Sequence, residues 1–593
     1  METRTPAGPP GAYDRDVTQA STAAQSASAG QPESGPVEQT SDSGGPSSSG
    51  ASSAGPPADG GGGRLPDVVR RRLATIDGRL DGNSWLATAV VVAIAAILRL
   101  VGLSDIKGKI FDEVYYARDG WALVEHGVEW NFKDNAPSYV VHPPLGKWLI
   151  GLGEWAFGYQ DAEHNISVPG ALLTTAPEFG WRISAVIAGT LSVLLLVRIA
   201  RRMFRSTVLG CAAGLLLALD GFHLVLSRTA LLDIFLLLFV LAAFGALVLD
   251  RDARRRRWAR AVDAGLDPTA PGRAGRPPFA VPWWRLAAGL LLGLAFGVKW
   301  SALYFVPVFA LMVILWEVGL RRSVGVRRPW RDALLDELPW LVLAGVTMAL
   351  AYLATWTGWF LSDDGYYRLA ERYPNTPGLS DTPVLGALQN LYTYHRAALD
   401  FHTTLSTPHK YQSWPWQWLL LGRPVAFHWS GEGNCGAPSC ASEILLLGTP
   451  LLWWSFLPAL AATAWLGIAR RDWRAGAILL TVAAGLLPWF WFAISDGRVM
   501  FSFYTAPALP FLVLAVVYVL GAIISPAGAR APAPPGSAAA QEAYDRRLIG
   551  SVVAGVYVLL VAICFAYFYP IFVGQLIPYA DWSARMWLDG RWI

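Results

Sequence analysis

Two adjacent carboxylates, Asp112 and Glu113, are well placed in this sequence to accept or donate a proton. They follow the first long apolar stretch, a position where ionisable groups are costly because lipid is near. One interpretation is that they begin a short helix over residues 114–124, since carboxylates favour a helix N-terminus. The other is that one of them acts as a general base on a substrate hydroxyl. The residue pattern leaves both interpretations open.

Single charges beside three other apolar stretches could belong to the same site. Arg182 begins the second stretch, Asp233 lies in the first turn of the fourth, and Lys299 ends the fifth. Snorkelling towards water would also explain Arg182 and Lys299, and pairing with Arg228 would explain Asp233. The predicted topology nevertheless places all three at the membrane depth of the acidic pair, on the same side, which favours a shared site.

The segment with His142 and Lys147 contains two prolines, Pro143 and Pro144, which could begin a second interfacial helix. His142 and Lys147 could then line the site or form a solvated rim. Gly146-Lys147 is not a P-loop, because the upstream glycine and the following Ser or Thr are missing. Nothing in this motif indicates ATP.

A later segment is rich in aromatic residues and contains Trp414, Trp416 and Arg423. An interfacial aromatic belt explains most of it, although aromatic faces also suit sugar rings or an extended peptide. Further along, Arg498 and Tyr504 precede prolines that predict a kinked or unwound start of a membrane helix.

Cysteine usage indicates one disulfide and no metal centre. The chain has four cysteines, and Cys435 and Cys440 share a loop predicted to be extracytoplasmic. A local disulfide is favoured over a metal site because no nearby His or second Cys pair would complete the ligand set. Cys211 and Cys564 fall within apolar stretches and are interpreted as packing residues.

The composition is typical of a polytopic membrane protein. Of the 593 residues, 53% are hydrophobic and 16% are charged, whereas soluble proteins carry about 25% charged residues. The mean hydropathy is +0.36. The net charge of +4 gives no broad basic surface, so no nucleic-acid partner is expected.

About eleven apolar stretches approach the roughly 20 residues that a membrane helix needs. They lie near 85–103, 181–200, 207–226, 230–249, 284–300, 301–319, 338–359, 444–467, 475–493, 503–525 and 548–573. Residues 1–63 are rich in Ser, Gly, Pro and Ala, which predicts a disordered tail, and 64–84 form a basic juxtamembrane segment.

The arginine clusters between these stretches all fall on one side if the N-terminus is cytoplasmic, as the positive-inside rule requires. The sequence therefore predicts a multi-pass protein of the plasma membrane with its membrane domain over 85–575. Residues 104–180 and 360–443 become two large outer loops, and 576–593 become an extracytoplasmic tail. The candidate site residues then lie on the extracytoplasmic face.

Taken in order, these segments resemble the protein O-mannosyltransferase family, and most of all its actinobacterial members. The matching segments are 111–114, 142–147, Arg182, 231–233, 299–300, 413–416 with 423–425, and 507–510. The resemblance spans roughly 85–575. It departs from eukaryotic members because 360–443 is too short to hold their β-trefoil insert.

The resemblance implies an all-α membrane protein with the C-type glycosyltransferase (GT-C) fold and extracytoplasmic interfacial helices. It also implies transfer of mannose, with inversion, from polyprenyl-phosphate-mannose to Ser or Thr of polypeptides met during secretion. On this view Asp112 is the base, with Glu113 and Asp233 as secondary acids. The other expected roles are donor-phosphate binding by Arg182, Lys299 and, more weakly, Arg498, and donor or acceptor binding by His142, Lys147, Trp414, Trp416, Arg423 and Tyr504. No cofactor or metal is expected.

Two alternatives come from other classes of protein. A related lipid-linked glycosyltransferase could transfer another sugar, or could act on a lipid or polysaccharide acceptor. A transporter or flippase would instead show inverted repeats and charges near mid-membrane. No repeat is evident and the charges lie at one face, so this second alternative is disfavoured.

Overall fold

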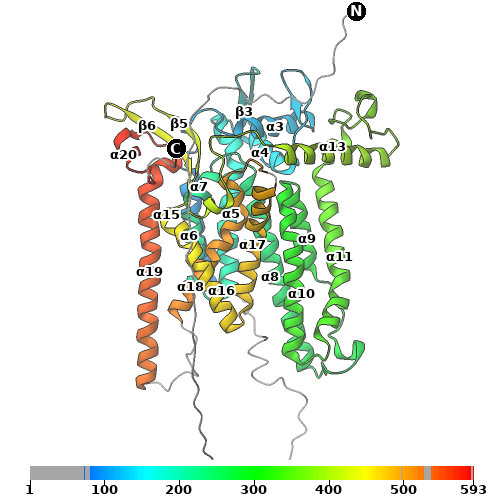
Figure 1. The fold of residues 1–593 in the computed structure, drawn as a ribbon, viewed down its shortest axis with the longest axis vertical. Helices are drawn as coiled ribbons and strands as arrows, with labels where there is room; N and C mark the ends of the chain where they lie inside the picture. The colour runs from blue at the N-terminus through cyan, green and yellow to red at the C-terminus, as the bar shows by residue number, and fades with distance from the viewer. Residues whose placement is uncertain (1–72, 74–80, 496, 526–535, 589–591, 593) are drawn as a thin grey trace, which may run out of the picture. The chain divides into compact units, whose positions relative to one another are not determined.

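The computed structural model describes residue 73 and residues 81–495, 497–525, 536–588 and 592. The tail predicted to be disordered, 1–63, lies outside the described residues, as does most of the basic segment 64–84. The described residues form a bundle of long helices, and shorter elements cross one end of it (Figure 1).

The long helices confirm the predicted all-α, polytopic fold class. Nine helical segments in the described part of the chain are long and apolar enough to cross a membrane. They are α2 (Gly82–Leu100), α5 (Pro177–Phe204), α8 (Asp233–Asp263), η2 with α10 (Trp300–Val324), α11 (Pro329–Thr355), α15 with α16 (Pro450–Arg470), α17 (Trp473–Ser495), η4 with α18 (Ser502–Ile524) and α19 (Ala538–Val573). Two shorter apolar helices, α6 (Thr207–Ala218) and α9 (Trp283–Phe296), coincide with the remaining two predicted stretches.

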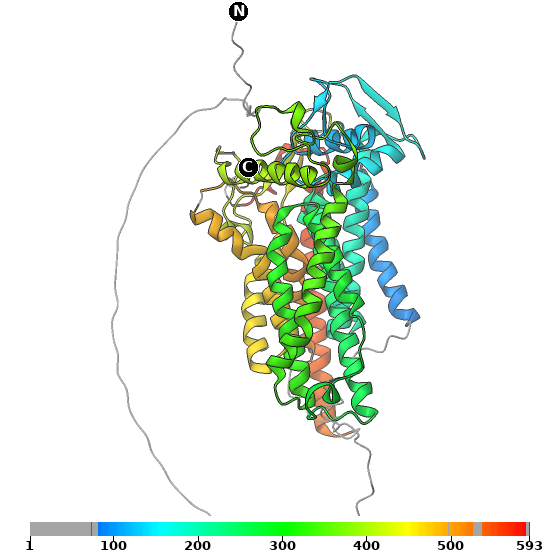
Figure 2. The ribbon, with the colours of Figure 1, turned by 90° about the vertical axis from the view of Figure 1, so that its right-hand side faces the viewer.

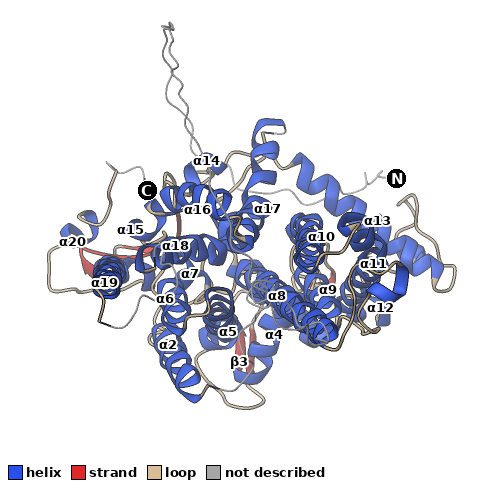
Figure 3. Ribbon diagram, turned by 90° about the horizontal axis from the view of Figure 1, so that it is seen from below, coloured by secondary structure: helices blue, strands red, loops and turns tan. Residues whose placement is uncertain are grey.

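The helices differ in how much of their surface the protein covers. In α8 and in η4 with α18, 72% of the most apolar window is buried, whereas the values for α11 and α19 are 17% and 22%. Seen along the bundle, α8 lies between α5 and α9, while α19 stands at the edge (Figure 3). A helix that is apolar all round belongs either in a core or against lipid, and this bundle uses both positions.

Three helices lie across the end of the bundle where α5 and α8 begin: α3 (Glu113–His126), α4 (Leu145–Phe157) and α13 (Leu385–Thr404) (Figures 1 and 2). The backbones of α3 and α4 pack closely at two glycines. A Cβ on Gly151 would lie 2.3 Å from the carbonyl oxygen of Gly120, so only glycine fits there. The same region holds the hairpins β1–β2 (Trp130–Asn131, Ala136–Pro137) and β3–β4 (Gly158–Asp161, Ile166–Pro169).

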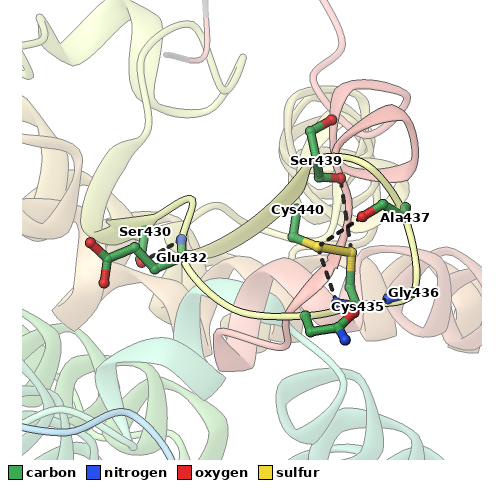
Figure 4. Close-up of a disulfide and its surroundings, with 8 residues drawn as sticks. Ser430, Glu432, Cys435, Gly436, Ala437, Ser439 and Cys440 are labelled. Atoms are coloured by element: carbon green, nitrogen blue, oxygen red, sulfur yellow. Dashed lines mark hydrogen bonds between the residues drawn. A yellow bond between two sulfur atoms is a disulfide. The ribbon is translucent and has the colours of Figure 1, made fainter.

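A small antiparallel sheet corrects one predicted boundary. Strands β5 (Val425–Ser430), β6 (Cys440–Leu446) and β7 (Ile577–Pro578) pair in that order. The sequence predicted a membrane helix from about 444, but 444–446 belong to β6, and α15 (Pro450–Trp454) begins later. A short buried apolar run has no periodicity that separates strand from helix. The structure also contains the expected Cys435–Cys440 disulfide, which closes the loop between β5 and β6 (Figure 4).

The remaining elements are short. They are α7 (Gly221–Leu226), η1 (Gly272–Gly275), α12 (Thr357–Leu361), η3 (Ala370–Arg372), α14 (Pro415–Trp418) and α20 (Tyr579–Ser583). The predicted arginine clusters lie at the other end of the bundle, where Arg285 pairs with Asp250 and Glu337 across three helices. The assignment of that end to the cytoplasm stays a prediction from the positive-inside rule.

Candidate functional site

A buried ion pair fixes the loop that leads into α3. Arg182, near the start of α5, donates from Nε to Glu113 Oε1 at 2.9 Å and from Nη2 to Oε2 at 2.8 Å. Its guanidinium also donates to the carbonyl oxygens of Leu103, Ile106 and Gly108 at 2.9–3.1 Å. One side chain therefore holds the segment from 103 to 113 in place.

Glu113 is saturated with hydrogen bonds. Besides Arg182, its carboxylate accepts from the Trp181 indole at 3.3 Å and from the backbone N–H groups of Ile110 and Ala230, both at 3.0 Å. The residue is 0% exposed. The expected roles of Glu113 as a secondary acid and of Arg182 as a phosphate partner do not fit this geometry, because each spends its polar atoms on the other and on backbone groups.

Asp112 differs from Glu113 in the hydrogen bonding of its carboxylate. It stands at the N-cap position of α3, but its backbone is helical (φ −70°, ψ −5°) and its side chain makes no capping hydrogen bond. The predicted helix therefore does begin at this acidic pair, but Asp112 does not cap it through its side chain. Phe111 precedes it with φ +48°, a strained value for a non-glycine residue. The Phe111 ring stacks on Phe427 at 4.5 Å, which helps to hold that conformation.

Asp112 lies beside an ion pair formed by two other predicted residues. Lys299 Nζ donates to Asp233 Oδ2 at 2.7 Å, joining the start of η2 to the first turn of α8. Burial raises the pKa of Asp112 to about 6, the Lys299 ammonium opposes that rise, and the Asp233 carboxylate adds to it. A carboxylate with this pKa is ionised at neutral pH and basic enough to accept a proton.

An aromatic wall and a second cation lie close to Lys299. The Lys299 ammonium is 5.5 Å from the ring centre of Phe503 and 6.0 Å from that of Tyr504. The guanidinium of Arg498 lies 5.9 Å from the same Tyr504 ring. Arg498 Nε is buried and has no hydrogen-bond partner within the described residues. A buried cationic donor without an acceptor suits a site that binds an anion.

His142 belongs to this cluster and Lys147 does not. The His142 ring lies 6.3 Å from Tyr116 and 5.2 Å from His402. Burial and the nearby cations, Lys299 first among them, hold the pKa of His142 well below its usual range, so the ring is neutral. Lys147 is instead 1% exposed and paired with Glu129 and, at 3.8 Å, with Asp119. Its polar head is committed to a structural ion pair, which argues against the expected role in substrate binding.

The segment that contains Trp414 and Trp416 contacts this cluster through Trp418. Trp414 and Trp416 stack on each other at 5.6 Å, and Trp416 is 50% exposed. Arg423 donates to the Lys410 carbonyl oxygen at 2.8 Å. Trp418, which the sequence did not single out, contacts Tyr504 edge-to-face at 6.2 Å. The expected contact of Trp414, Trp416 and Arg423 with donor or acceptor stays a prediction.

Sequence reasoning missed two residues of the cluster, His402 and Tyr116. Both contact His142, and His402 also receives a hydrogen bond from Arg498. The only signal for His402 was its spacing of seven residues from His395, which places both on one face of α13. That spacing alone does not distinguish a site from helix packing.

One group of possible metal ligands occurs among the described residues. It consists of Asp161, Glu163 and His164. Asp161 already accepts from the Lys109 ammonium at 3.0 Å, and a cation in that position would repel a metal ion. We assign no metal to this group.

Comparisons with known proteins agree with the geometry. Residues 89–266 match the family described as dolichyl-phosphate-mannose-protein mannosyltransferase, and residues 387–592 match the C-terminal four-helix membrane region of protein O-mannosyltransferases. The chain is 38% identical over 526 residues to the polyprenol-phosphate-mannose–protein mannosyltransferase of Mycolicibacterium smegmatis strain ATCC 700084, covering 86% of this chain and 94% of that protein. The corresponding protein of Mycobacterium tuberculosis strain H37Rv is 38% identical over 525 residues, with 86% and 92% covered.

A solved structure shows the fold. The Saccharomyces cerevisiae protein O-mannosyltransferase Pmt1-Pmt2 complex bound to the sugar donor aligns with a TM-score of 0.64 at 15% identity, covering 89% of this chain and 94% of that chain. The membrane domain thus has the GT-C fold that the resemblance implied. The chain belongs to the family of polyprenol-phosphate-mannose–protein mannosyltransferases.

Proposed function

We propose that this protein transfers mannose from polyprenyl-phosphate-mannose to Ser or Thr hydroxyls of polypeptides, with inversion at the anomeric carbon. The observation that carries this proposal is Asp112, a carboxylate with no hydrogen bond from any described residue, set beside the Lys299–Asp233 pair. Family membership supports the donor and the acceptor, because relatives covering most of the chain carry that activity in their names.

Asp112 serves as the general base. The acceptor oxygen attacks the anomeric carbon of mannose while Asp112 takes the hydroxyl proton. The bond from that carbon to the phosphate oxygen breaks, and its electron pair leaves with the polyprenyl phosphate. A single displacement of this kind inverts the anomeric configuration, as in inverting glycosidases. Asp112 then returns the proton to solvent.

Lys299 and Arg498 hold the phosphate. A departing phosphate is a weak base, so cationic groups stabilise it and no general acid is required. Lys299 is oriented by Asp233 at 2.7 Å, and Arg498 has a buried Nε free of partners among the described residues. We infer that the reaction needs no metal ion or cofactor, since these two side chains supply the positive charge. Addition of a chelator should then leave the rate unchanged.

The site sits where a lipid-linked donor would present its phosphate. Asp233 opens the membrane helix α8, Lys299 precedes η2 with α10, and Arg498 precedes η4 with α18. All three therefore lie at the end of membrane-spanning segments. The positive-inside rule supports an extracytoplasmic position in the plasma membrane for this end, with the N-terminus cytoplasmic and the C-terminus outside.

Transfer by the purified protein tests this function. The protein, in lipid nanodiscs, would be incubated with radiolabelled polyprenyl-phosphate-mannose and a Ser/Thr-rich peptide, with Asp112→Asn as the control. We expect label in the peptide for the wild-type protein alone. Label that enters lipid or glycan but never peptide would instead identify a glycosyltransferase with another acceptor.

A further inference from the structure

We propose that His402 is a positioning residue that holds Arg498 in its orientation towards the donor phosphate by accepting a hydrogen bond at Nδ1. This inference rests on the proposed function, because it concerns how the donor is bound. His402 lies in the last turn of α13, on the second outer loop, and none of the chemistry described above uses it.

The hydrogen bonds of His402 determine which ring nitrogen faces Arg498. His402 Nε2 lies 3.1 Å from the carbonyl oxygen of Val141, which can only accept, so Nε2 carries the proton. Burial, aided by Arg498, lowers the pKa of His402 to about 4, so the ring is neutral at neutral pH. Nδ1 is then an acceptor, and Arg498 Nη2 donates to it at 3.4 Å.

His402 and Tyr394 of α13 both hydrogen-bond to the segment before α4. Tyr394, two turns earlier, donates to the Val140 carbonyl oxygen at 2.7 Å and accepts from the Val140 N–H at 2.9 Å. The segment is fixed at its far end too, where Leu145 N–H donates to the Gly297 carbonyl oxygen at 3.0 Å. Gly297 is two residues from Lys299, so α13 helps to fix the positions of both Lys299 and Arg498.

Arg498 has few other contacts to define its position. It lies in an extended stretch between α17 and η4 rather than on a helix. Its ring contact with Tyr504 is 5.9 Å, and its Nε has no partner among the described residues. Among the described residues, His402 is the one that hydrogen-bonds to this guanidinium, and the bond leaves Nε available for a phosphate oxygen.

Three substitutions at position 402 separate the two hydrogen bonds of the ring. Asn places an amide oxygen near the position of Nδ1 and can accept from Arg498, whereas Gln reaches towards Nε2 and can donate to Val141. Phe keeps the ring and removes both bonds. We expect His402→Asn to bind polyprenyl-phosphate-mannose nearly as well as the wild type. His402→Gln and His402→Phe should both bind it roughly 5- to 10-fold more weakly, because both lose the hydrogen bond from Arg498.

The deciding experiment is a double-mutant cycle with Arg498→Ala, measured as the dissociation constant of the donor and as KM and kcat. If His402 acts through Arg498, His402→Phe should cause no further loss once Arg498 is absent. Tyr394→Phe is the matched control, because it loosens the neighbouring Val140 without touching Arg498. Its effect should be the same in both backgrounds.

The outcomes distinguish failure of the inference from failure of the proposed function. Additive losses for His402→Phe and Arg498→Ala, or rescue by Gln instead of Asn, would overturn the positioning role of His402 while leaving Arg498 as a phosphate ligand. Normal donor binding and turnover by Arg498→Ala would overturn the assignment of Arg498 in the proposed function itself. Thermal unfolding of each variant identifies any that fails to fold, and if His402→Phe does so, the contrast between His402→Asn and His402→Gln carries the test.

Discussion

The consecutive residues Glu113 and Asp112 show how one backbone presents two carboxylates for opposite purposes. Glu113 points into the protein and receives hydrogen bonds from Arg182, Trp181 and two backbone N–H groups. The Asp112 carboxylate receives none from the described residues, and Lys299 and Asp233 lie near enough to shift its pKa. A saturated carboxylate stabilises structure, whereas one without protein hydrogen bonds keeps its oxygens available to a substrate.

The Glu113–Arg182 ion pair holds Asp112 in position. Arg182 donates hydrogen bonds to three carbonyl oxygens of the loop that ends at Asp112. Glu113, the next residue, begins α3 and is held by the same arginine. Phe111 holds a positive φ between these fixed points. Rigid placement of a base is what allows it to act without reorganisation in the transition state. We therefore expect the Glu113–Arg182 pair to affect turnover through the position of Asp112.

Replacing Asp112 by Asn should produce the largest effect on turnover. Asn keeps the size of the side chain but cannot accept the proton, and loss of a general base typically costs about 10²–10⁴-fold in rate. Because Asp112 makes no capping bond, the helix should be unaffected. The measurement is mannosyl transfer at saturating donor, together with donor binding as a check on the site. Near-normal turnover would remove Asp112 from the mechanism.

Replacing Glu113 by Gln should instead act on stability. The change leaves the buried charge of Arg182 without its counter-ion, a loss of about 3–5 kcal/mol for a pair of this kind. We expect a sharp fall in the amount of folded protein and in its resistance to heating in detergent, with donor binding retained by the fraction that folds.

Glu154→Gln is the matched control for that experiment. Glu154 is equally buried, but its carboxylate oxygens have no hydrogen-bond partner in the described part of the chain. Burial raises the pKa of Glu154 well above its usual range, and no described residue hydrogen-bonds to its carboxylate, so Gln should be tolerated. Equal losses for the two variants would mean that the Glu113–Arg182 pair has no special structural role.

Replacing Lys299 by Met should weaken donor binding by a smaller factor. A hydrogen bond to a charged group contributes about 1.5–3 kcal/mol, which corresponds to roughly 10- to 150-fold in the dissociation constant. The variant also leaves Asp233 unpaired, so it should be compared with the double variant Lys299→Met/Asp233→Asn. If Asp233 serves only to orient Lys299, the double variant should bind the donor no worse than the single one. Donor affinity unchanged in both would favour the snorkelling interpretation of Lys299.

The sequence predicted the membrane helices well because length and apolarity largely determine them. It also gathered Asp112, Asp233 and Lys299 correctly, since each lies at the end of an apolar stretch on one side. It could not separate Asp112 from Glu113, because the difference depends on Arg182 and Ala230, which are distant along the chain. The same holds for Lys147, whose partners Glu129 and Asp119 are set by the packing of α3 against α4.

His402 is a residue of the cluster that the sequence did not indicate. Nothing near it in sequence marks it, and the role proposed for it depends on hydrogen bonds with Val141 and Arg498, which are distant along the chain. The misplaced span at 444 has a comparable cause, since β6 acquires its strand partners from 425–430 and from 577–578. Long-range pairing of this kind leaves no local periodicity.

The pH dependence of transfer should give the smallest effect and the finest test of the difference between the two carboxylates. The base must be ionised, and the pKa of Asp112 in the free protein is raised to about 6. The value of kcat/KM should therefore be constant above about pH 7, fall to half near pH 6, and drop about tenfold per unit below that.

Replacing Lys299 or Asp233 should shift the acidic limb of the pH dependence of kcat/KM in opposite directions. Lys299 opposes the raised pKa, so in Lys299→Met the residual activity should begin to fall at a higher pH than in the wild type. Asp233 adds to it, so in Asp233→Asn the fall should begin at a lower pH. The measurement is the midpoint of the acidic limb in each variant, with peptide and buffer ions held constant. A limb that stays in place in both variants would show that the group being titrated is not in contact with Lys299 and Asp233, and so is not Asp112.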